Sequence, residues 1–102
     1  MPHLYSVAVF VTDMDRALLF YRDHLGLPLL RQGSFGAEFL DGETRLGVHP
    51  AVHADAQKLV GRHTGVTFHV EDLLDYCERL HQRGVKFMAE PTQQGFGIMA
   101  LV

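Results

Sequence analysis

The sequence contains the same order of predicted elements twice. In residues 9–28 an apolar strand is followed by an acidic turn, an amphipathic helix, a glycine and a second apolar stretch, and residues 67–87 repeat that order. Asp13 and Asp72 occupy equivalent places at the start of the two helices. An internal repeat restricts the architecture strongly, because both copies are expected to fold alike. We therefore expect two similar modules in this chain.

The first copy predicts the order strand, helix, strand, strand, strand. Residues 4–12 are rich in β-branched and aromatic residues and predict a strand, with Ser6, Ala8 and Phe10 on one face and Tyr5, Val7, Val9 and Val11 on the other. Asp13 is a typical helix N-cap. The helix that follows has an apolar stripe and ends before Gly26, and its stripe consists of Met14, Ala17, Leu18, Tyr21 and Leu25. Further strands are predicted at 27–31, 36–40 and 44–49, the last two joined at Asp41-Gly42 and the last ended by Pro50.

The second copy predicts one strand fewer. Residues 51–62 are polar and are interpreted as a linker. A strand is predicted at 64–71, and a helix from Asp72 to Gly84 with Leu73, Tyr76, Cys77 and Leu80 on its apolar stripe. A strand at 85–89, a turn at 91–95 and a strand at 96–102 follow. Since residues 98–102 are an apolar run, we expect a further C-terminal segment, or an open sheet edge that a partner chain fills.

Composition excludes several function classes. The chain has 102 residues and a net charge of −3, without a cluster of Lys and Arg, so nucleic-acid binding is not expected. No apolar run reaches the roughly 18 residues of a membrane span. The single cysteine, Cys77, is interpreted as a buried, inert thiol. With no secretion signal recognised, a cytoplasmic location is expected.

Two motifs resemble a known family. Asp13-Met14-Asp15-Arg16-Ala17, followed by Phe20-Tyr21-Arg22-Asp23-His24-Leu25-Gly26-Leu27-Pro28, is similar to the first module of the vicinal oxygen chelate superfamily, which includes glyoxalases, bleomycin-resistance proteins and extradiol dioxygenases. Phe68-His69-Val70-Glu71-Asp72-Leu73 is similar to its second module. The resemblance implies an α+β fold in which two βαβββ modules form a curved mixed sheet around a ligand cup. Residues 1–102 would be one domain, with module one at about 1–50, a linker at about 51–62 and an incomplete module two at about 63–102.

The resemblance also implies where metal ligands would lie. Many members hold a divalent metal through a residue seven positions before each helix cap and one in the middle of the fourth strand. Here these places are Ser6, Gly65 and Gly47. Serine is a poor ligand and glycine has no side chain to offer, so we predict no metal and no cofactor. The alternative is a divalent metal held by shifted ligands, from His49, His63, His69 and a residue beyond Val102.

Several other residues are candidates for the cup. In an alternating strand His69 is on the face opposite Val66, Phe68 and Val70. It would then either face the cup, where it could act as a general acid or base, or form a hydrogen bond with a neighbouring strand. Glu38 and Arg45 form a cross-strand pair or reach a ligand. Gly47 and Gly65 make room for a ligand, or mark a bulge or a tight sheet contact. The predicted ligand-binding set is Ser6, Ala8, Phe10, Glu38, Arg45, Gly47, His49, Gly65, Thr67 and His69.

Function follows from these interpretations. We predict a metal-independent small-molecule binding protein of the bleomycin-resistance type, acting as a homodimer. One alternative is a metal-dependent lyase, isomerase or dioxygenase with shifted ligands. The other is a metal-free enzyme that uses His69 as acid or base.

Overall fold

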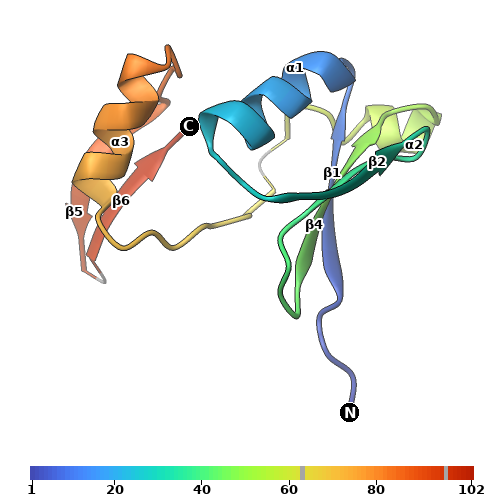
Figure 1. Ribbon diagram of the computed structural model, residues 1–102, viewed down its shortest axis with the longest axis horizontal. Coiled ribbons are helices and arrows are strands. Elements are labelled where there is room, and N and C mark those ends of the chain that lie inside the picture. The colour runs from blue at the N-terminus through green and yellow to red at the C-terminus, as the bar shows by residue number, and fades with distance from the viewer. Residues whose placement is uncertain (63, 96) are drawn as a thin grey trace. The chain divides into compact units, whose positions relative to one another are not determined.

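The computed structural model describes residues 1–62, 64–95 and 97–102 and consists of two compact units (Figure 1). Unit 1 is Met1–Val66 and unit 2 is Thr67–Val102. The elements of unit 1 follow the predicted order, with a short helix added near its end. They are β1 (Ser6–Val11), α1 (Met14–Leu18), η1 (Leu19–His24), β2 (Leu29–Gly33), β3 (Gly36–Phe39), β4 (Arg45–Pro50) and α2 (Ala54–Gln57).

The four strands of unit 1 form one mixed sheet in the order β1-β4-β3-β2. The first and last strands of the module pair in parallel, whereas β3 pairs antiparallel with both β2 and β4. The turn between β3 and β4 contains Gly42, as Asp41-Gly42 predicts, and β4 ends at Pro50. Gly36 begins β3 with φ +124°, and a Cβ at this position would overlap the backbone carbonyl oxygen of Val48. The βαβββ order and the mixed sheet predicted for the first copy are confirmed.

The predicted helix begins at its expected cap but changes its winding halfway. The Asp13 carboxylate accepts a hydrogen bond from the backbone N–H of Arg16 at 3.1 Å. After α1 the backbone widens into the π-helical turn η1, in which the N–H of Leu25 donates to the carbonyl oxygen of Phe20 at 2.8 Å, five residues back. Gly26 then adopts φ +77°, the left-handed conformation that ends many helices. The start and end of the helix are therefore those that the sequence predicts.

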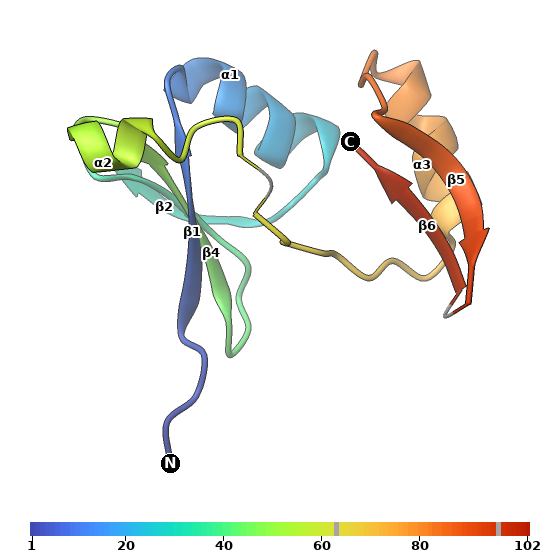
Figure 2. The ribbon, with the colours of Figure 1, turned by 180° about the vertical axis from the view of Figure 1, so that it is seen from behind.

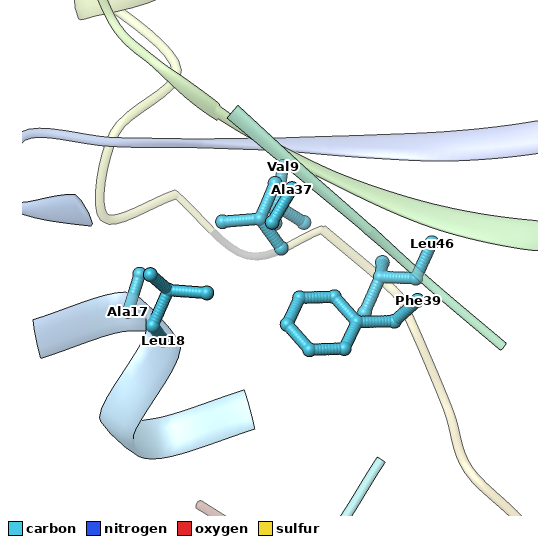
Figure 3. Close-up of a cluster of buried hydrophobic side chains, with 7 residues drawn as sticks. Val9, Ala17, Leu18, Ala37, Phe39 and Leu46 are labelled. Atoms are coloured by element: carbon cyan, nitrogen blue, oxygen red, sulfur yellow. The ribbon is translucent and has the colours of Figure 1, made fainter. Parts of the chain in front are cut away.

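The core of unit 1 lies between this helix and one face of the sheet. Figure 3 shows side chains of α1 directed at side chains of the strands. The cluster consists of Val9, Ala17, Leu18, Ala37, Phe39, Leu46 and Val48. On β3 and on β4 the core residues are two positions apart, as expected for a sheet that packs a helix on one face. The opposite face of the sheet, called here the second face, therefore does not belong to this core.

Unit 2 is a helix packed on a two-stranded antiparallel sheet (Figure 2). Its elements are α3 (Leu73–Gln82), β5 (Ala89–Gln94) and β6 (Gly97–Leu101). Asp72 caps α3 by accepting the N–H of Asp75 at 3.1 Å, and Gly84 ends it with φ +83°. The predicted stripe is confirmed, since Cys77 and Leu80 are buried and Leu73 and Tyr76 are partly buried.

The strand predicted at 64–71 is wrong. Residue 63 lies outside the described residues, and residues 64–70 are neither helix nor strand. Gly65 has φ +78°, which interrupts an extended backbone. Residues 67–71 belong to a unit whose described strands, β5 and β6, pair with each other. An alternating pattern forms a strand only where another strand supplies hydrogen-bond partners, and no described strand of this unit pairs with it.

The last strands of the chain are shifted along the sequence. The strand predicted at 85–89 and the turn predicted at 91–95 are wrong, because β5 runs from Ala89 to Gln94. Pro91 lies in an irregularity of the β5–β6 pairing between Ala89 and Thr92, where a missing N–H is tolerated. The strand predicted at 96–102 is confirmed as β6, with residue 96 outside the described residues. Among the described helices, none has the length and apolar character that crossing a bilayer requires.

Candidate ligand-binding face

Seven of the ten predicted ligand-binding residues lie together on the second face of the unit 1 sheet. The parallel register of β1 and β4 sets Ser6 beside Arg45, Ala8 beside Gly47, and Phe10 beside His49. Glu38 on β3 is opposite Gly47. Residues of β1, β3 and β4 that do not enter the core thus share one surface. The sequence predicts this grouping correctly, and the structure adds which strands are neighbours.

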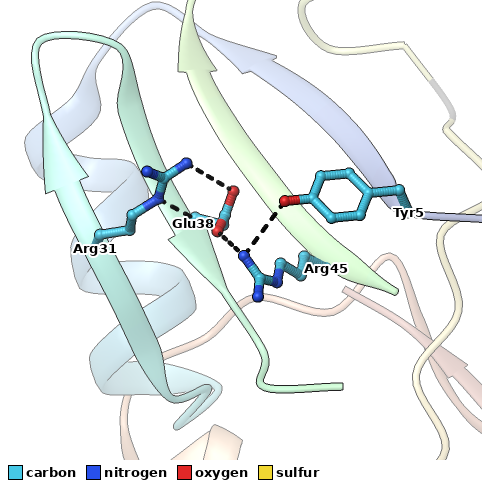
Figure 4. A network of polar contacts seen from close by, with 4 residues as sticks. All are labelled: Tyr5, Arg31, Glu38 and Arg45. Carbon is cyan, nitrogen blue, oxygen red and sulfur yellow. Dashed lines mark hydrogen bonds and ion pairs between the residues drawn. The ribbon is translucent and has the colours of Figure 1, made fainter. Parts of the chain in front are cut away.

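A network of charged groups crosses this face (Figure 4). The guanidinium of Arg45 contacts the Glu38 carboxylate at 2.8 Å, which confirms the predicted cross-strand pair. Arg31 on β2 approaches the same carboxylate from the other side, with Nε 3.4 Å from Oε1. Arg45 also donates to the Tyr5 hydroxyl at 3.4 Å, and its Cζ lies 5.5 Å from the centroid of that ring. One carboxylate is therefore held between two guanidinium groups.

This arrangement changes the pKa of Glu38. Burial against the sheet acts to raise it, but hydrogen bonds from Arg31 and Arg45 and their positive charges outweigh that effect. The pKa of the Glu38 carboxyl therefore lies below its ordinary value. The carboxylate remains ionised and holds both guanidinium groups over the second face.

Three aromatic rings form a row next to the charged network. The His49 ring lies 6.0 Å from the Phe10 ring and 6.3 Å from the Phe35 ring, centroid to centroid. Phe35, in the turn between β2 and β3, lies under the guanidinium of Arg31, whose Cζ is 5.3 Å from the ring centroid. The face thus combines ring surfaces with a small number of polar groups, which is the usual composition of small-molecule sites.

Gly47 makes room for a side chain of this protein. A Cβ on Gly47 would lie 2.6 Å from Nε2 of His49, so the imidazole lies over the glycine. Nδ1 of His49 is 2.8 Å from the carbonyl oxygen of Phe35. In the neutral ring this contact places the proton on Nδ1 and leaves the lone pair on Nε2. The glycine therefore leaves room for the His49 ring on the second face.

The other three predicted site residues are not part of the unit 1 sheet. Gly65 is in unit 1 but outside the sheet, and Thr67 and His69 are in unit 2. Because residues 64–70 form no strand, strand alternation does not set the direction of the Thr67 and His69 side chains. His69 is exposed. His63, part of the alternative metal set, lies outside the described residues.

Three further residues, which the sequence did not predict, belong to this face. Arg31 joins it because the β2–β3 register sets it opposite Glu38. Phe35 joins it through the turn between Gly33 and Gly36. Tyr5 was assigned to the valine face of the first strand, but β1 begins at Ser6 and the Tyr5 hydroxyl contacts Arg45. The Arg31–Glu38 pairing could have been found from the predicted strands at 27–31 and 36–40, had their antiparallel register been assigned.

A pocket of about 210 Å³ lies beside β1. Its lining comes from that strand and from the segment after α2, and consists of Val7, Ala8, Val9, Phe10, Leu59, Arg62 and Thr64. Ala8 and Phe10 link it to the predicted set. Small-molecule sites commonly measure about 300–1,000 Å³, so this pocket accommodates only a fragment-sized group.

The residues of unit 1 do not fit a divalent metal at the places that the resemblance implies. Ser6 pairs with Arg45, whose positive charge repels a cation, and the space over Gly47 is filled by the His49 ring. Glu38, the acidic side chain of the network, is held by two guanidinium groups. In the described part of the chain, no three His, Cys, Asp or Glu side chains are grouped as metal ligands. The chemistry of this face therefore suits an anion better than a divalent cation.

Comparisons with known proteins agree with the fold. A family model described as the Glyoxalase/Bleomycin resistance protein/Dioxygenase superfamily matches residues 3–102. The protein YetH of Bacillus subtilis (strain 168) is 27% identical over 99 residues, covering 90% of this chain and 81% of YetH.

Two solved structures share the architecture. A member of the same superfamily from Sphaerobacter thermophilus DSM 20745 has a TM-score of 0.82 at 21% identity, covering 98% of this chain and 86% of that one. TnmS3, an antibiotic binding protein from Streptomyces sp. CB03234, has a TM-score of 0.80 at 24% identity, covering 98% and 84%. At these TM-scores both share the α+β fold of this chain. The family match over residues 3–102 shows that this chain belongs to the glyoxalase/bleomycin resistance protein/dioxygenase superfamily.

Proposed function

We propose that this protein binds a small molecule on the second face of the unit 1 sheet and does so without a divalent metal. The observation that carries the proposal is the gathering of seven predicted site residues on the face opposite the core. These residues come from β1, β3 and β4, and the core holds those strands in register. A binding surface built on a packed sheet keeps its side chains in place before the ligand arrives.

The comparisons support binding as the general role. TnmS3 is described as an antibiotic binding protein, and it shares the fold of this chain. The superfamily also includes enzymes, so membership alone does not decide between binding and catalysis. The charged and aromatic groups of the second face supply recognition, and binding requires no nucleophile or metal.

Metal independence rests on the poor donor set at Ser6 and Gly47. The metal-dependent alternative would use His49, whose Nε2 carries a lone pair, together with His63, His69 and a residue beyond Val102. The metal-free enzyme would use His69 as acid or base. A chelator should abolish ligand binding only if the protein depends on a metal. His69→Ala should abolish turnover only if the protein is the metal-free enzyme.

Phe10→Ala removes an aromatic side chain from the second face and tests whether that face binds the ligand. Phe20→Ala is the matched control, because it removes an aromatic side chain from η1 instead. Fragments that bind the wild-type chain would first be found by ligand-observed NMR and then titrated. We expect Phe10→Ala to weaken them about tenfold, the loss that follows from removing one aromatic contact, and Phe20→Ala to leave them unchanged. Binding should persist after chelation and in His69→Ala.

Other results would reject the proposal. If both substitutions weaken fragment affinity equally, or if no fragment binds at all, the second face is not the binding site. Loss of binding on chelation would support the metal-dependent alternative. Turnover of a bound compound that His69→Ala abolishes, with affinity unchanged, would support the metal-free enzyme.

We also propose that the protein acts as a homodimer in the cytoplasm. The dimer is supported by exposed apolar residues on β6, among them Ile98 and Leu101. The compartment is supported by the single cysteine, which cannot form a disulfide within the chain.

A further inference from the structure

The second face carries an excess of positive charge at Arg31. Two guanidinium groups contact the single carboxylate of Glu38, so the three charges sum to +1. Arg45 makes the shorter contact, 2.8 Å, and its side chain is 32% exposed. Arg31 makes only contacts of 3.4 and 3.5 Å, and its side chain is 65% exposed. Arg31 is therefore the more accessible of the two cations for a second anion.

The accessible guanidinium lies at one end of the aromatic row. Arg31 stands over Phe35, Phe35 is next to His49, and His49 is next to Phe10. The row passes from the β2–β3 turn across β4 to β1. Phe35 is among the exposed large hydrophobic residues, so the part of its ring that Arg31 does not cover is open to a partner. A molecule that contacts Arg31 thus has ring surfaces beside it.

We propose, building on the proposed binding function, that the ligand is a flat aromatic molecule bearing an acidic group. The acid binds the guanidinium of Arg31, and the aromatic part lies along Phe35 and His49. Guanidinium groups bind carboxylates through two parallel hydrogen bonds, and aromatic rings favour offset-stacked or edge-to-face contacts. A neutral aromatic compound would leave Arg31 unused, and a cationic one would be repelled by the net charge of the network.

Matched probes separate the contributions of ring and charge. Naphthalene-2-carboxylate carries both, naphthalene-2-carboxamide keeps the ring without the charge, and cyclohexanecarboxylate keeps the charge without an aromatic ring. Titration of the full chain, followed by calorimetry or by NMR shifts, gives the three affinities. We expect the aromatic acid to bind about tenfold more tightly than the amide, since a charge-assisted hydrogen bond contributes more than a neutral one. It should also bind about tenfold more tightly than cyclohexanecarboxylate, which lacks the aromatic contact with Phe35 and His49.

Arg31→Gln assigns the charge preference to a residue. It should reduce the affinity for the aromatic acid to that of the amide and leave the amide unaffected. Arg79→Gln is the matched control, because Arg79 also lies over an aromatic ring, that of Tyr76, and also pairs with a carboxylate, that of Asp75. It should change neither affinity.

Glu38→Gln provides an independent check in the opposite direction. Removing the carboxylate that competes for both guanidinium groups should tighten binding of the aromatic acid severalfold, provided that circular dichroism shows the variant folded. An unchanged or weaker affinity in the folded variant would contradict the role of the network.

The outcomes distinguish this inference from the function on which it rests. If the amide binds as tightly as the acid, or if only neutral or basic fragments bind and Phe10→Ala weakens them, the ligand class is wrong and the binding function stands. If neither the probes nor any fragment binds, both are wrong. If the acid binds preferentially but Arg31→Gln does not change its affinity, another residue binds the acidic group and the inference is rejected.

Discussion

Cys77 shows how burial sets the chemistry of a single side chain. It lies on α3 and only 4% of its surface is exposed. Burial raises the pKa of its thiol, and the negative charge of Glu90 raises it further. The reactive thiolate is therefore disfavoured, which agrees with the inert thiol that the apolar stripe of the helix predicts.

Labelling of Cys77 with a disulfide reagent should require opening of unit 2. We expect the folded chain to react at least roughly a hundredfold more slowly than the chain in denaturant, because local opening costs a few kcal/mol. Leu80→Ala, which removes a buried neighbour on the same stripe, should speed the reaction. Rapid stoichiometric labelling under native conditions would show that the thiol is accessible.

The sequence predicts the local role of a residue, such as a helix cap, better than it predicts which side chains that residue contacts. Asp13 and Asp72 cap their helices as predicted, because a cap depends on residues only three positions away. Gly47 was predicted to make room for a ligand or to mark a bulge or a tight sheet contact, and the structure shows the His49 ring over it. Alternation placed both residues on one face, but the direction of an imidazole ring depends on its partner, here the Phe35 carbonyl oxygen.

At the scale of elements, the pairing of β3 with β2 and β4 holds the charged network together. Register brings Glu38 opposite Arg31 on one side, and Arg45 lies one step along the same face on the other. The carboxylate ties three strands across the face that the helix does not cover. Its contribution to stability depends on its ionisation.

Stability should fall in acid because of Glu38. Its pKa is lowered by folding, so its contribution is complete above the unfolded value near 4.5 and is lost as the pH falls through the folded value. We expect the urea midpoint of the wild-type chain to fall more between neutrality and about pH 3 than that of Glu38→Gln. Asp55→Asn, at a fully exposed carboxylate, should behave like wild type. An equal fall of the urea midpoint with pH in Glu38→Gln and in the wild-type chain would contradict this role.

Elements that are stabilised locally were predicted well, and those that depend on a partner strand were not. The hairpin at Asp41-Gly42 and both helices carry turn or cap residues within their own segments. The stretch at 64–71 has a good alternating pattern, but Gly65 interrupts it and no described strand of unit 2 pairs with it. Pro91 predicted a turn, yet an irregular pairing accommodates it within β5.

At the scale of the whole molecule, unit 2 has little sheet with which to form a core. In the described part of this unit α3, β5 and β6 are the helix and strands, and Cys77, Leu80 and Val85 are buried while apolar residues of β6 stay exposed. Isolated two-stranded sheets are marginally stable in water. This agrees with the proposal that a second copy of the chain covers apolar surface.

The mass in solution tests the homodimer. Light scattering at micromolar concentration should give twice the chain mass of 11.5 kDa. Ile98→Lys places a charge on a β6 residue that is 44% exposed and should shift the mass toward the monomer. Leu74→Lys, on the exposed side of α3, is the control and should not. A monomeric wild-type chain would reject the dimer.

The π-helical turn η1 has a consequence for how the length of this segment can vary. Its hydrogen bond from Leu25 to Phe20 spans five residues where an α-helix spans four. The segment is therefore equivalent to an α-helix that has gained one residue and absorbed it as a wider turn. Relatives that lack this residue can keep the same apolar stripe and the same glycine stop with ordinary winding. A one-residue alignment gap between positions 19 and 24 would then indicate that the relative has an α-helical turn where this chain has a π-helical one, and the helix itself would be retained.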